Sequence, residues 1–227
     1  MAWAWVQDDS IYDTQGSTTV VKAFTTNVTA GSLIVVKVSA NTTTATATCA
    51  DSLGQTYSLA VGPTVNASLG GSGFTQWVFY FANSAAGANT VTVTFSASIP
   101  FKRMVIVEYS GLATSAVLDV TAAATGNSAS PDSGAATTTA NNELIFGGGI
   151  TDSGNIGAGT GFTAREAPDA YSKPEDKNGA TAGSYNATFT TSASQWIAQM
   201  ATFKEPSAAA GWGPLLSLQN NRLVVSQ

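Results

Sequence analysis

Apolar residues alternate with small polar residues, mostly threonine, over short stretches of this chain, and this period of two indicates β-strands. The clearest stretch is Asn89–Ser96, NTVTVTFS, in which Val91, Val93 and Phe95 fall on one face and the threonines on the other. One face is therefore expected to meet a core and the other to meet solvent. Similar runs predict further strands at Thr18–Thr26, Leu33–Ser39, Phe74–Ala82, Met104–Tyr109, Glu143–Ile150, Tyr185–Thr190 and Trp196–Phe203.

The composition agrees with strands and disfavours helices. Threonine, a β-branched residue suited to half-exposed sheet surface, occurs 31 times in 227 residues. Val120–Ala124 is rich in alanine, but Asp119 and Gly126 bound it too closely for a stable helix, so we expect an edge strand or a loop. Short strands without intervening helices predict an all-β fold, an antiparallel two-sheet β-sandwich of jelly-roll type, with a closed barrel as the alternative.

Two pairs of segments echo each other along the chain. Leu33-Ile34 matches Leu144-Ile145, and Val93–Ser98 matches Ala187–Ser192, with sequence offsets of 111 and 94 residues. Tandem copies would give one constant offset, so we expect residues 1–205 to form a single sandwich with pseudo-symmetric halves. Convergent strand and turn composition is the other explanation for the echo.

The C-terminal end has a different composition. Residues 206–211 form a small-residue linker, and residues 212–227 are too short to make a core of their own. This segment is expected either to return to the sandwich as an added strand or to dock on a partner. The residues expected to bind that partner are Trp212, Leu215, Leu216, Leu218, Leu223, Val224 and Val225.

The residue types that are missing exclude several classes of function. There is no histidine and one cysteine, Cys49, so His-based triads, zinc sites and an intramolecular disulfide are excluded. A net charge of −5 without basic clusters argues against nucleic-acid binding. The chain has no run of about 20 apolar residues, so no membrane span is predicted. The first ten residues lack the features of a signal peptide, so production in a cytoplasm is expected.

Acidic residues are the first candidates for chemistry. Asp8, Asp9 and Asp13 could supply oxygen ligands to calcium, but their spacing fits no EF-hand, so we expect a solvated turn and no metal site. Asp51 and Asp152 begin the sequences DSLG and DSGN and are expected to cap those turns.

No catalytic residue and no cofactor site is predicted. Glu108 lies mid-strand, but its counterpart in the second half is Thr202, so a glycosidase pair is missing, and we expect a salt bridge or an outward position instead. The sequence GxSxG is absent, which excludes a conventional serine hydrolase and leaves a Ser-Lys pair open.

Tryptophans are the candidates for sugar stacking. Trp3 and Trp5 share a strand face, and Trp77 lies in a later strand. Exposed aromatic rings could stack on glycans, although packing in the core is the more common role of a strand tryptophan, above all for Trp77.

Several turn and strand motifs in residues 18–125 resemble those of a known class of module. These are NVTAGSLIVVKVS, DSLGQTY, FANSAAGANTVTVTFS and VIVEYSG. They are similar to the Thr/Ser/Ala/Gly-rich jelly-roll β-sandwich modules of phage virion structural proteins and bacterial extracellular proteins. The resemblance implies no active site.

The missing signal peptide favours the phage side of that resemblance. It implies a non-enzymatic virion structural protein, assembled in the host cytoplasm, that decorates a capsid or belongs to a tail. Such a protein would form homo-oligomers and attach through its terminal segments to other virion proteins, such as the major capsid or tail protein. The alternative is an extracellular carbohydrate-binding or adhesive surface module that recognises cell-surface glycans.

Overall fold

Seven of the eight strands expected from the alternation form in the structure, a computed structural model that describes residues 2–207. Those that match directly are β2 (Ser17–Ala23), β3 (Leu33–Ala40), β6 (Phe74–Phe81), β7 (Thr90–Ile99), β8 (Lys102–Ser110), β11 (Glu143–Thr151) and β17 (Ser194–Phe203). The run at 185–190 is divided into β15 (Ser184–Tyr185) and β16 (Phe189–Thr190). The remaining strands are β1 (Ala4–Asp13), β4 (Ala47–Asp51), β5 (Ser58–Asn66), β9 (Leu118–Ser128), β10 (Ala136–Thr137), β12 (Gly157–Ala158), β13 (Thr163–Ala164) and β14 (Ser172–Gly179).

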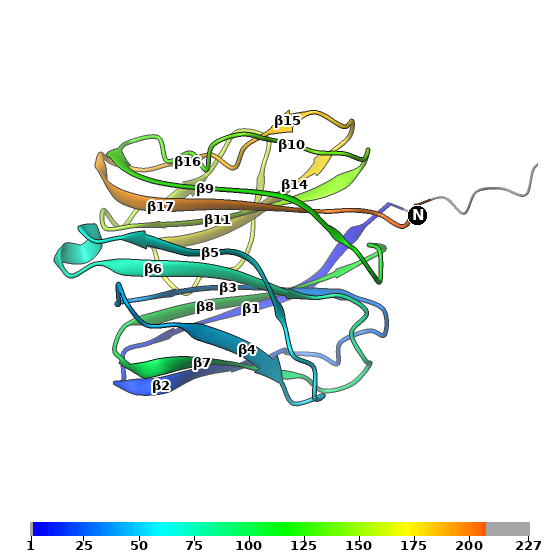
Figure 1. The fold of residues 1–227 in the computed structure, drawn as a ribbon, viewed down its shortest axis with the longest axis horizontal. Coiled ribbons are helices and arrows are strands. Elements are labelled where there is room, and N and C mark those ends of the chain that lie inside the picture. Colours follow the sequence, from blue (N-terminus) through cyan, green and yellow to red (C-terminus); the bar gives the residue numbers. More distant parts are fainter. Residues whose placement is uncertain (1, 208–227) are drawn as a thin grey trace, which may run out of the picture.

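Three principal sheets are stacked on one another (Figure 1). In stacking order they are β2-β7-β4, then β1-β8-β3-β6-β5, then β13-β14-β11-β17-β9, and the pairs β10-β15 and β12-β16 cover the third sheet. Neighbouring strands run antiparallel. The all-β antiparallel architecture is therefore confirmed and is consistent with a β-sandwich, but a third layer is present where two sheets were expected. The alanine-rich stretch Val120–Ala124 lies in β9, at the edge of its sheet, so of the two predictions the edge strand is confirmed and the loop is not.

The two five-stranded sheets repeat one strand order. The order β1-β8-β3-β6-β5 in the N-terminal half corresponds to β9-β17-β11-β14-β13 in the C-terminal half. The echoed pairs Leu33-Ile34 and Leu144-Ile145 lie in β3 and β11, the middle strands of these sheets. Their offsets differ because the elements between them differ in length, with nine residues in β5 and two in β13. Unequal offsets therefore do not argue against a repeat. That residues 1–205 form a single sandwich stays a prediction.

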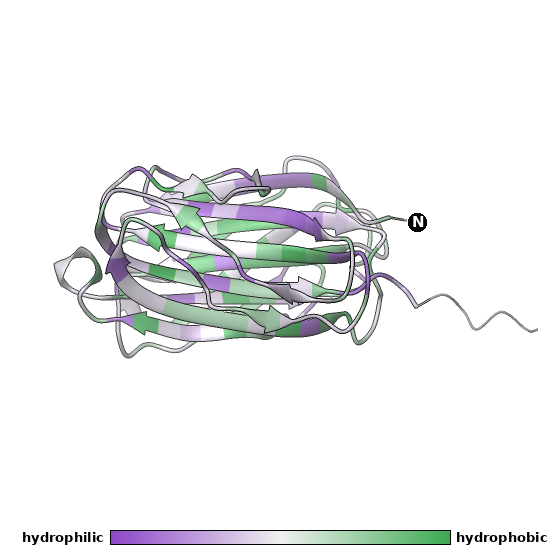
Figure 2. Ribbon diagram, turned by 90° about the horizontal axis from the view of Figure 1, so that it is seen from above, coloured by the Kyte–Doolittle hydropathy of each residue, from purple (hydrophilic) through white to green (hydrophobic). Residues whose placement is uncertain are grey.

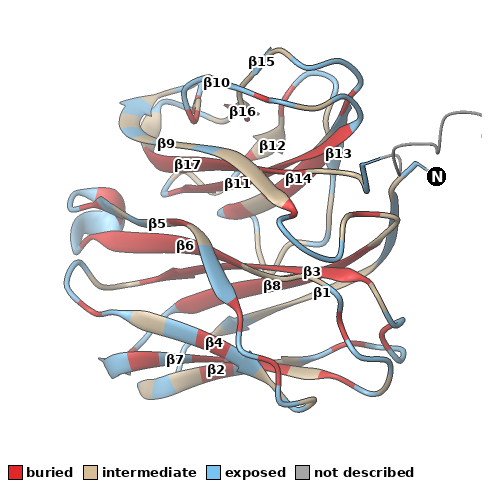
Figure 3. Cartoon of the chain, turned by 45° about the vertical axis from the view of Figure 1, so that its right-hand side comes forward, coloured by how far each residue is buried: buried red, intermediate tan, exposed pale blue. Residues whose placement is uncertain are grey.

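Burial follows the stacking. In β7, Val91, Val93 and Phe95 are buried while the side chains between them are not, which confirms the one-sided pattern. β3 and β11 are buried along their whole lengths, because each lies between two layers (Figure 3). Hydrophilic positions nevertheless interrupt the hydrophobic ones along the strands (Figure 2). The inner sheets therefore carry buried polar side chains, and these need partners within the protein.

The C-terminal segment predicted to bind a partner, residues 212–227, lies outside the described residues. Over residues 2–207, no helix is long and apolar enough to cross a bilayer.

Candidate functional site

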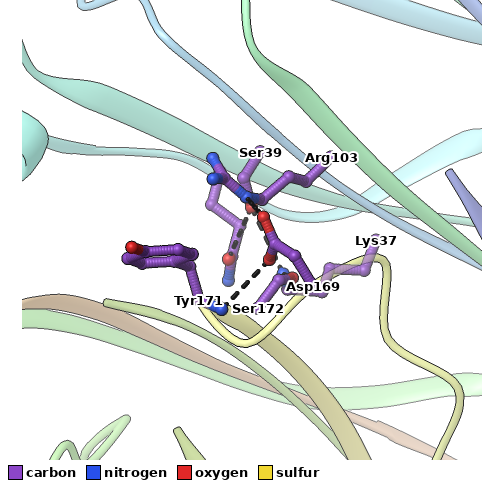
Figure 4. A network of polar contacts seen from close by, with 7 residues as sticks. Lys37, Ser39, Arg103, Asp169, Tyr171 and Ser172 are labelled. Carbon is purple, nitrogen blue, oxygen red and sulfur yellow. Dashed lines mark hydrogen bonds and ion pairs between the residues drawn. The ribbon is translucent and has the colours of Figure 1, made fainter. Parts of the chain in front are cut away.

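A buried polar network joins the two five-stranded sheets (Figure 4). The Lys37 ammonium in β3 donates to Ser172 Oγ at 2.6 Å and to Ser39 Oγ at 3.3 Å. Ser39 Oγ in turn donates to Gln76 Oε1 at 2.9 Å. Burial, and then the positive charge of Arg103, lower the pKa of Lys37 to about 7. The structure thus brings together a serine and a lysine that lie 135 residues apart in sequence.

This Ser-Lys pair has the chemistry of a nucleophile beside a base but not the access that a substrate needs. A lysine with a pKa near neutrality can take the proton of a serine hydroxyl. Lys37 and Ser172 are both 0% exposed, however, and Ser172 lies in the pairing between β11 and β14. A substrate carbonyl cannot reach the hydroxyl, so the pair serves to join the layers.

A second network continues from this one toward the surface. Arg103 Nε donates to Asp169 Oδ2 at 2.6 Å, and the backbone N–H of Tyr171 donates to Asp169 Oδ1 at 3.0 Å (Figure 4). The Arg103 guanidinium carbon lies 4.4 Å from the ring centre of Tyr12, 5.4 Å from that of Tyr171 and 5.6 Å from that of Phe74. These distances are those of cation–π contacts, so Arg103 holds three aromatic rings from both halves of the chain together.

The exposed aromatic residues of this region lie along β1 and just before β14. A bulge after Trp5 shifts the pairing with β8, so that Trp5, Asp8 and Tyr12 share one face of the strand. That face meets residues 165–171. The Arg165 guanidinium carbon lies 5.0 Å from the Trp5 ring centre, and the Glu166 N–H donates to Asp8 at 3.0 Å. We name Trp5, Tyr12 and Tyr171 the junction row, because these exposed rings follow the line where the two halves meet.

A cavity of about 160 Å³ opens beside Tyr171 at one end of this row. Its lining comes from η1 (Leu69–Gly71), β6, β8, β11 with the residue that follows it, and the segment before β14. The lining residues are Leu69, Gly70, Phe74, Arg103, Ile150, Thr151, Asp152 and Tyr171. Both halves of the chain therefore contribute to it.

The tryptophans proposed for sugar stacking do not form one site. Trp77 is 2% exposed and packs edge-on against Phe95, with ring centres 5.8 Å apart, so it belongs to the core. Trp3 packs edge-on against Tyr109 at 5.8 Å. Trp5 is 42% exposed and is the one of the three that a ligand could reach. Tyr12 and Tyr171 are the other exposed rings near Trp5. No periodic pattern in the sequence marked either of them.

The N-terminal acidic residues are separated by the strand that contains them. Asp9 pairs with Lys22 at 2.7 Å and Asp13 with Lys102 at 3.1 Å, while Asp8 faces the opposite side of β1. The expected solvated turn is therefore a strand, because β1 pairs with β8. No group of three potential metal ligands occurs within residues 2–207.

Of the two aspartates expected to cap turns, Asp51 does so and Asp152 does not. Asp51 caps its turn as predicted, because its Oδ1 accepts from the N–H groups of Leu53 and Gln55 at 3.0 Å. Asp152 instead accepts from the N–H of Gln195 at 3.1 Å, next to the start of β17.

Glu108 forms neither the salt bridge nor the outward position expected of it. It is 0% exposed. Its Oε1 accepts from Thr29 N–H and Ser32 Oγ, each at 2.8 Å, and its Oε2 accepts from Gln7 Nε2 at 2.6 Å. Neutral donors occupy both carboxylate oxygens, so Glu108 has a structural role.

No protein-family model, curated protein or solved structure matches this chain. Its function therefore has to be inferred from the arrangement of its own residues.

Proposed function

We propose that this protein is a non-enzymatic phage virion structural protein that decorates a capsid or belongs to a tail. The observation that supports this is the strand order. In the N-terminal half β1-β8-β3-β6 faces β2-β7-β4, which is the order expected of a jelly roll, a fold common among viral capsid proteins. The C-terminal half repeats the order of the larger sheet. In this proposal the stacked sheets make a durable building block.

The placement of the polar groups supports a role without catalysis. The Ser172–Lys37 pair and Glu108 are enclosed within the described structure and hydrogen-bonded there. A surface with few charges suits close packing of homo-oligomers in an array. In this proposal the protein assembles in the host cytoplasm and attaches to the major capsid or tail protein.

Removal of residues 207–227 is expected to abolish attachment and leave the remaining chain folded, because the apolar residues of that segment are the proposed anchor. The measurement is co-sedimentation with virion particles in a density gradient, with circular dichroism as the check of folding. A second variant keeps the full length but carries serine at the seven apolar positions of 212–227. It is expected to lose attachment as the truncation does. Undiminished co-sedimentation of both variants would contradict the proposed anchor.

A carbohydrate-binding or adhesive surface module is the second candidate function. The observation that favours it is the junction row, in which exposed Trp5, Tyr12 and Tyr171 lie close to arginine and aspartate side chains. Sugar sites combine such rings with polar groups. Binding of the full chain to a glycan array tests this function as a whole.

A further inference from the structure

The cavity beside Tyr171 has the size of a site for one small ring. Its volume of about 160 Å³ is well below the roughly 300–1,000 Å³ of pockets for drug-sized ligands. Leu69 and Ile150 provide an apolar floor, and each is 1% exposed. Phe74 contributes an aromatic wall. An extended oligosaccharide would not fit within it, whereas the terminal unit of one would.

Tyr171 provides a stacking surface that the protein holds in place. Tyr171 is 41% exposed and lines the cavity, so part of its side chain is accessible to a ligand there. The backbone N–H of Tyr171 donates to Asp169 at 3.0 Å, and its carbonyl accepts from Thr151 N–H at 2.9 Å. These bonds fix the backbone, and the Arg103 guanidinium carbon lies 5.4 Å from the ring centre, so the ring is partly held in place before a ligand packs on it.

Donors and acceptors converge on the same cavity. Within residues 2–207, the side-chain hydrogen bond of Arg103 runs from Nε to Asp169, which leaves its two terminal nitrogens as donors at the cavity wall. Asp152 Oδ1 accepts from Gln195 N–H at 3.1 Å, but its Oδ2 meets only the Gly70 N–H, at a long 3.4 Å. Asp152 therefore retains an oxygen that can accept from a ligand hydroxyl.

The charges at the cavity select against anions. Arg103 is already paired with Asp169, and Asp152 adds a second carboxylate, so the three groups together are negative. A phosphate, a sulfate or an acidic sugar would be repelled. A neutral sugar supplies hydroxyls for both Arg103 and Asp152 and a C–H face for Tyr171.

We propose that this cavity binds a single neutral pyranose ring, the terminal sugar of a glycan. The inference rests on the carbohydrate-binding candidate and assigns to it a site that excludes Trp3 and Trp77. Trp5, at the other end of the junction row, lies outside the cavity lining.

Titration of the ¹⁵N-labelled full-length chain with D-glucose, D-galactose, D-mannose and N-acetyl-D-glucosamine tests the proposal. At least one sugar is expected to give saturable amide shifts centred on Gly70, Thr151 and Gly154. Tyr171→Ala is expected to raise the Kd about tenfold or more, whereas Tyr171→Phe keeps the ring and stays within about threefold. Phe101→Ala is the matched control, because it removes an equally exposed ring that belongs neither to the junction row nor to the cavity lining, and it is expected to leave the Kd unchanged.

The outcomes separate this site from the broader function. Sugar binding that Trp5→Ala abolishes and Tyr171→Ala leaves intact would overturn the cavity proposal and keep the carbohydrate function. Absence of saturable shifts with all four sugars would also overturn the cavity, and the glycan array then decides the function independently. If Tyr171→Ala does not fold, the Kd of Asp152→Asn takes its place in the comparison. The position of the amide shifts in the unaltered chain then shows whether the sugar binds at the cavity.

Discussion

Replacement of Gly149 by valine is expected to lower the free energy of unfolding by about 3 kcal/mol or more, which is a large part of the 5–15 kcal/mol typical of a folded domain. Gly149 lies in β11, which has a packed layer on each side. A Cβ atom there would lie 2.7 Å from Ile156 Cδ1 and 3.0 Å from Phe189 Cδ1. Both neighbours are buried, so moving them disturbs a close-packed core.

The neighbouring glycines show that this strand depends on missing side chains. A Cβ at Gly147 would lie 2.8 Å from Glu175 Cγ, and one at Gly148 would lie 3.2 Å from Lys37 Cδ. Gly148 thus leaves room for the lysine that crosses from the central sheet. Three consecutive glycines would weaken an ordinary strand, but here they allow the layers to approach.

Thermal unfolding followed by circular dichroism measures the effect of Gly149→Val. The matched control is Gly16→Val, because a Cβ at Gly16 would meet only Ser98 Oγ, at an ordinary 3.5 Å. That exposed substitution is expected to change stability by about 0.5 kcal/mol or less. Equal melting temperatures for the two variants would contradict the packing described for β11.

The double variant Lys37→Met/Ser172→Ala is expected to be more stable than the parent at pH 7, by about 1–4 kcal/mol. Burial lowers the pKa of Lys37 from 10.5 to about 7. Between these values the unfolded chain holds a proton on Lys37 that the folded chain has lost, so the contribution of Lys37 to the parent's stability rises with pH across this window. Methionine removes that burial cost, and alanine removes the hydroxyl that would lose its partner. The gain should therefore shrink as the pH rises from 7 toward 10.5.

Glu175 provides the control of opposite sign. Burial raises the pKa of Glu175 from 4.5 to about 8. The folded chain retains this proton between pH 4.5 and 8 while the unfolded chain has released it, so stability falls as the pH rises through that window. Glu175→Gln is expected to remove this fall and to leave the rise above pH 8 in place.

Urea denaturation at several pH values from 5 to 10 measures both effects. Differences between variants cancel the contributions of the other titratable groups, provided that those groups are unaffected. A stability gain for Lys37→Met/Ser172→Ala that is the same at pH 7 and pH 10 would show that Lys37 is not a neutralised buried amine.

The alternation of residues predicted the strands well because it reflects local geometry. Seven of the eight expected strands form, and β7 has the buried and exposed faces that its valines and threonines indicated. The stacking of three sheets was not predicted, because burial of a second face depends on a distant part of the chain. Leu33–Ser39 is apolar at most positions instead of alternating, and such a run is typical of a strand covered on both faces.

The candidate site was largely hidden in the sequence for the same reason. Lys37 meets Ser172 across 135 residues, and Arg103 meets Asp169 across 66 residues. Such pairs come together through the packing of the two halves, which no local pattern encodes. Trp5 was identified because it is terminal and aromatic, whereas Tyr171 lies in a loop without periodicity.

Immunogold electron microscopy of gradient-purified phage particles, with an antibody against this chain, tests the proposed virion role. We expect label at regular positions on the capsid or tail of intact particles, and we expect the protein to migrate with those particles through the gradient. Particles that carry no label, with the protein remaining in the soluble fractions, would contradict the role.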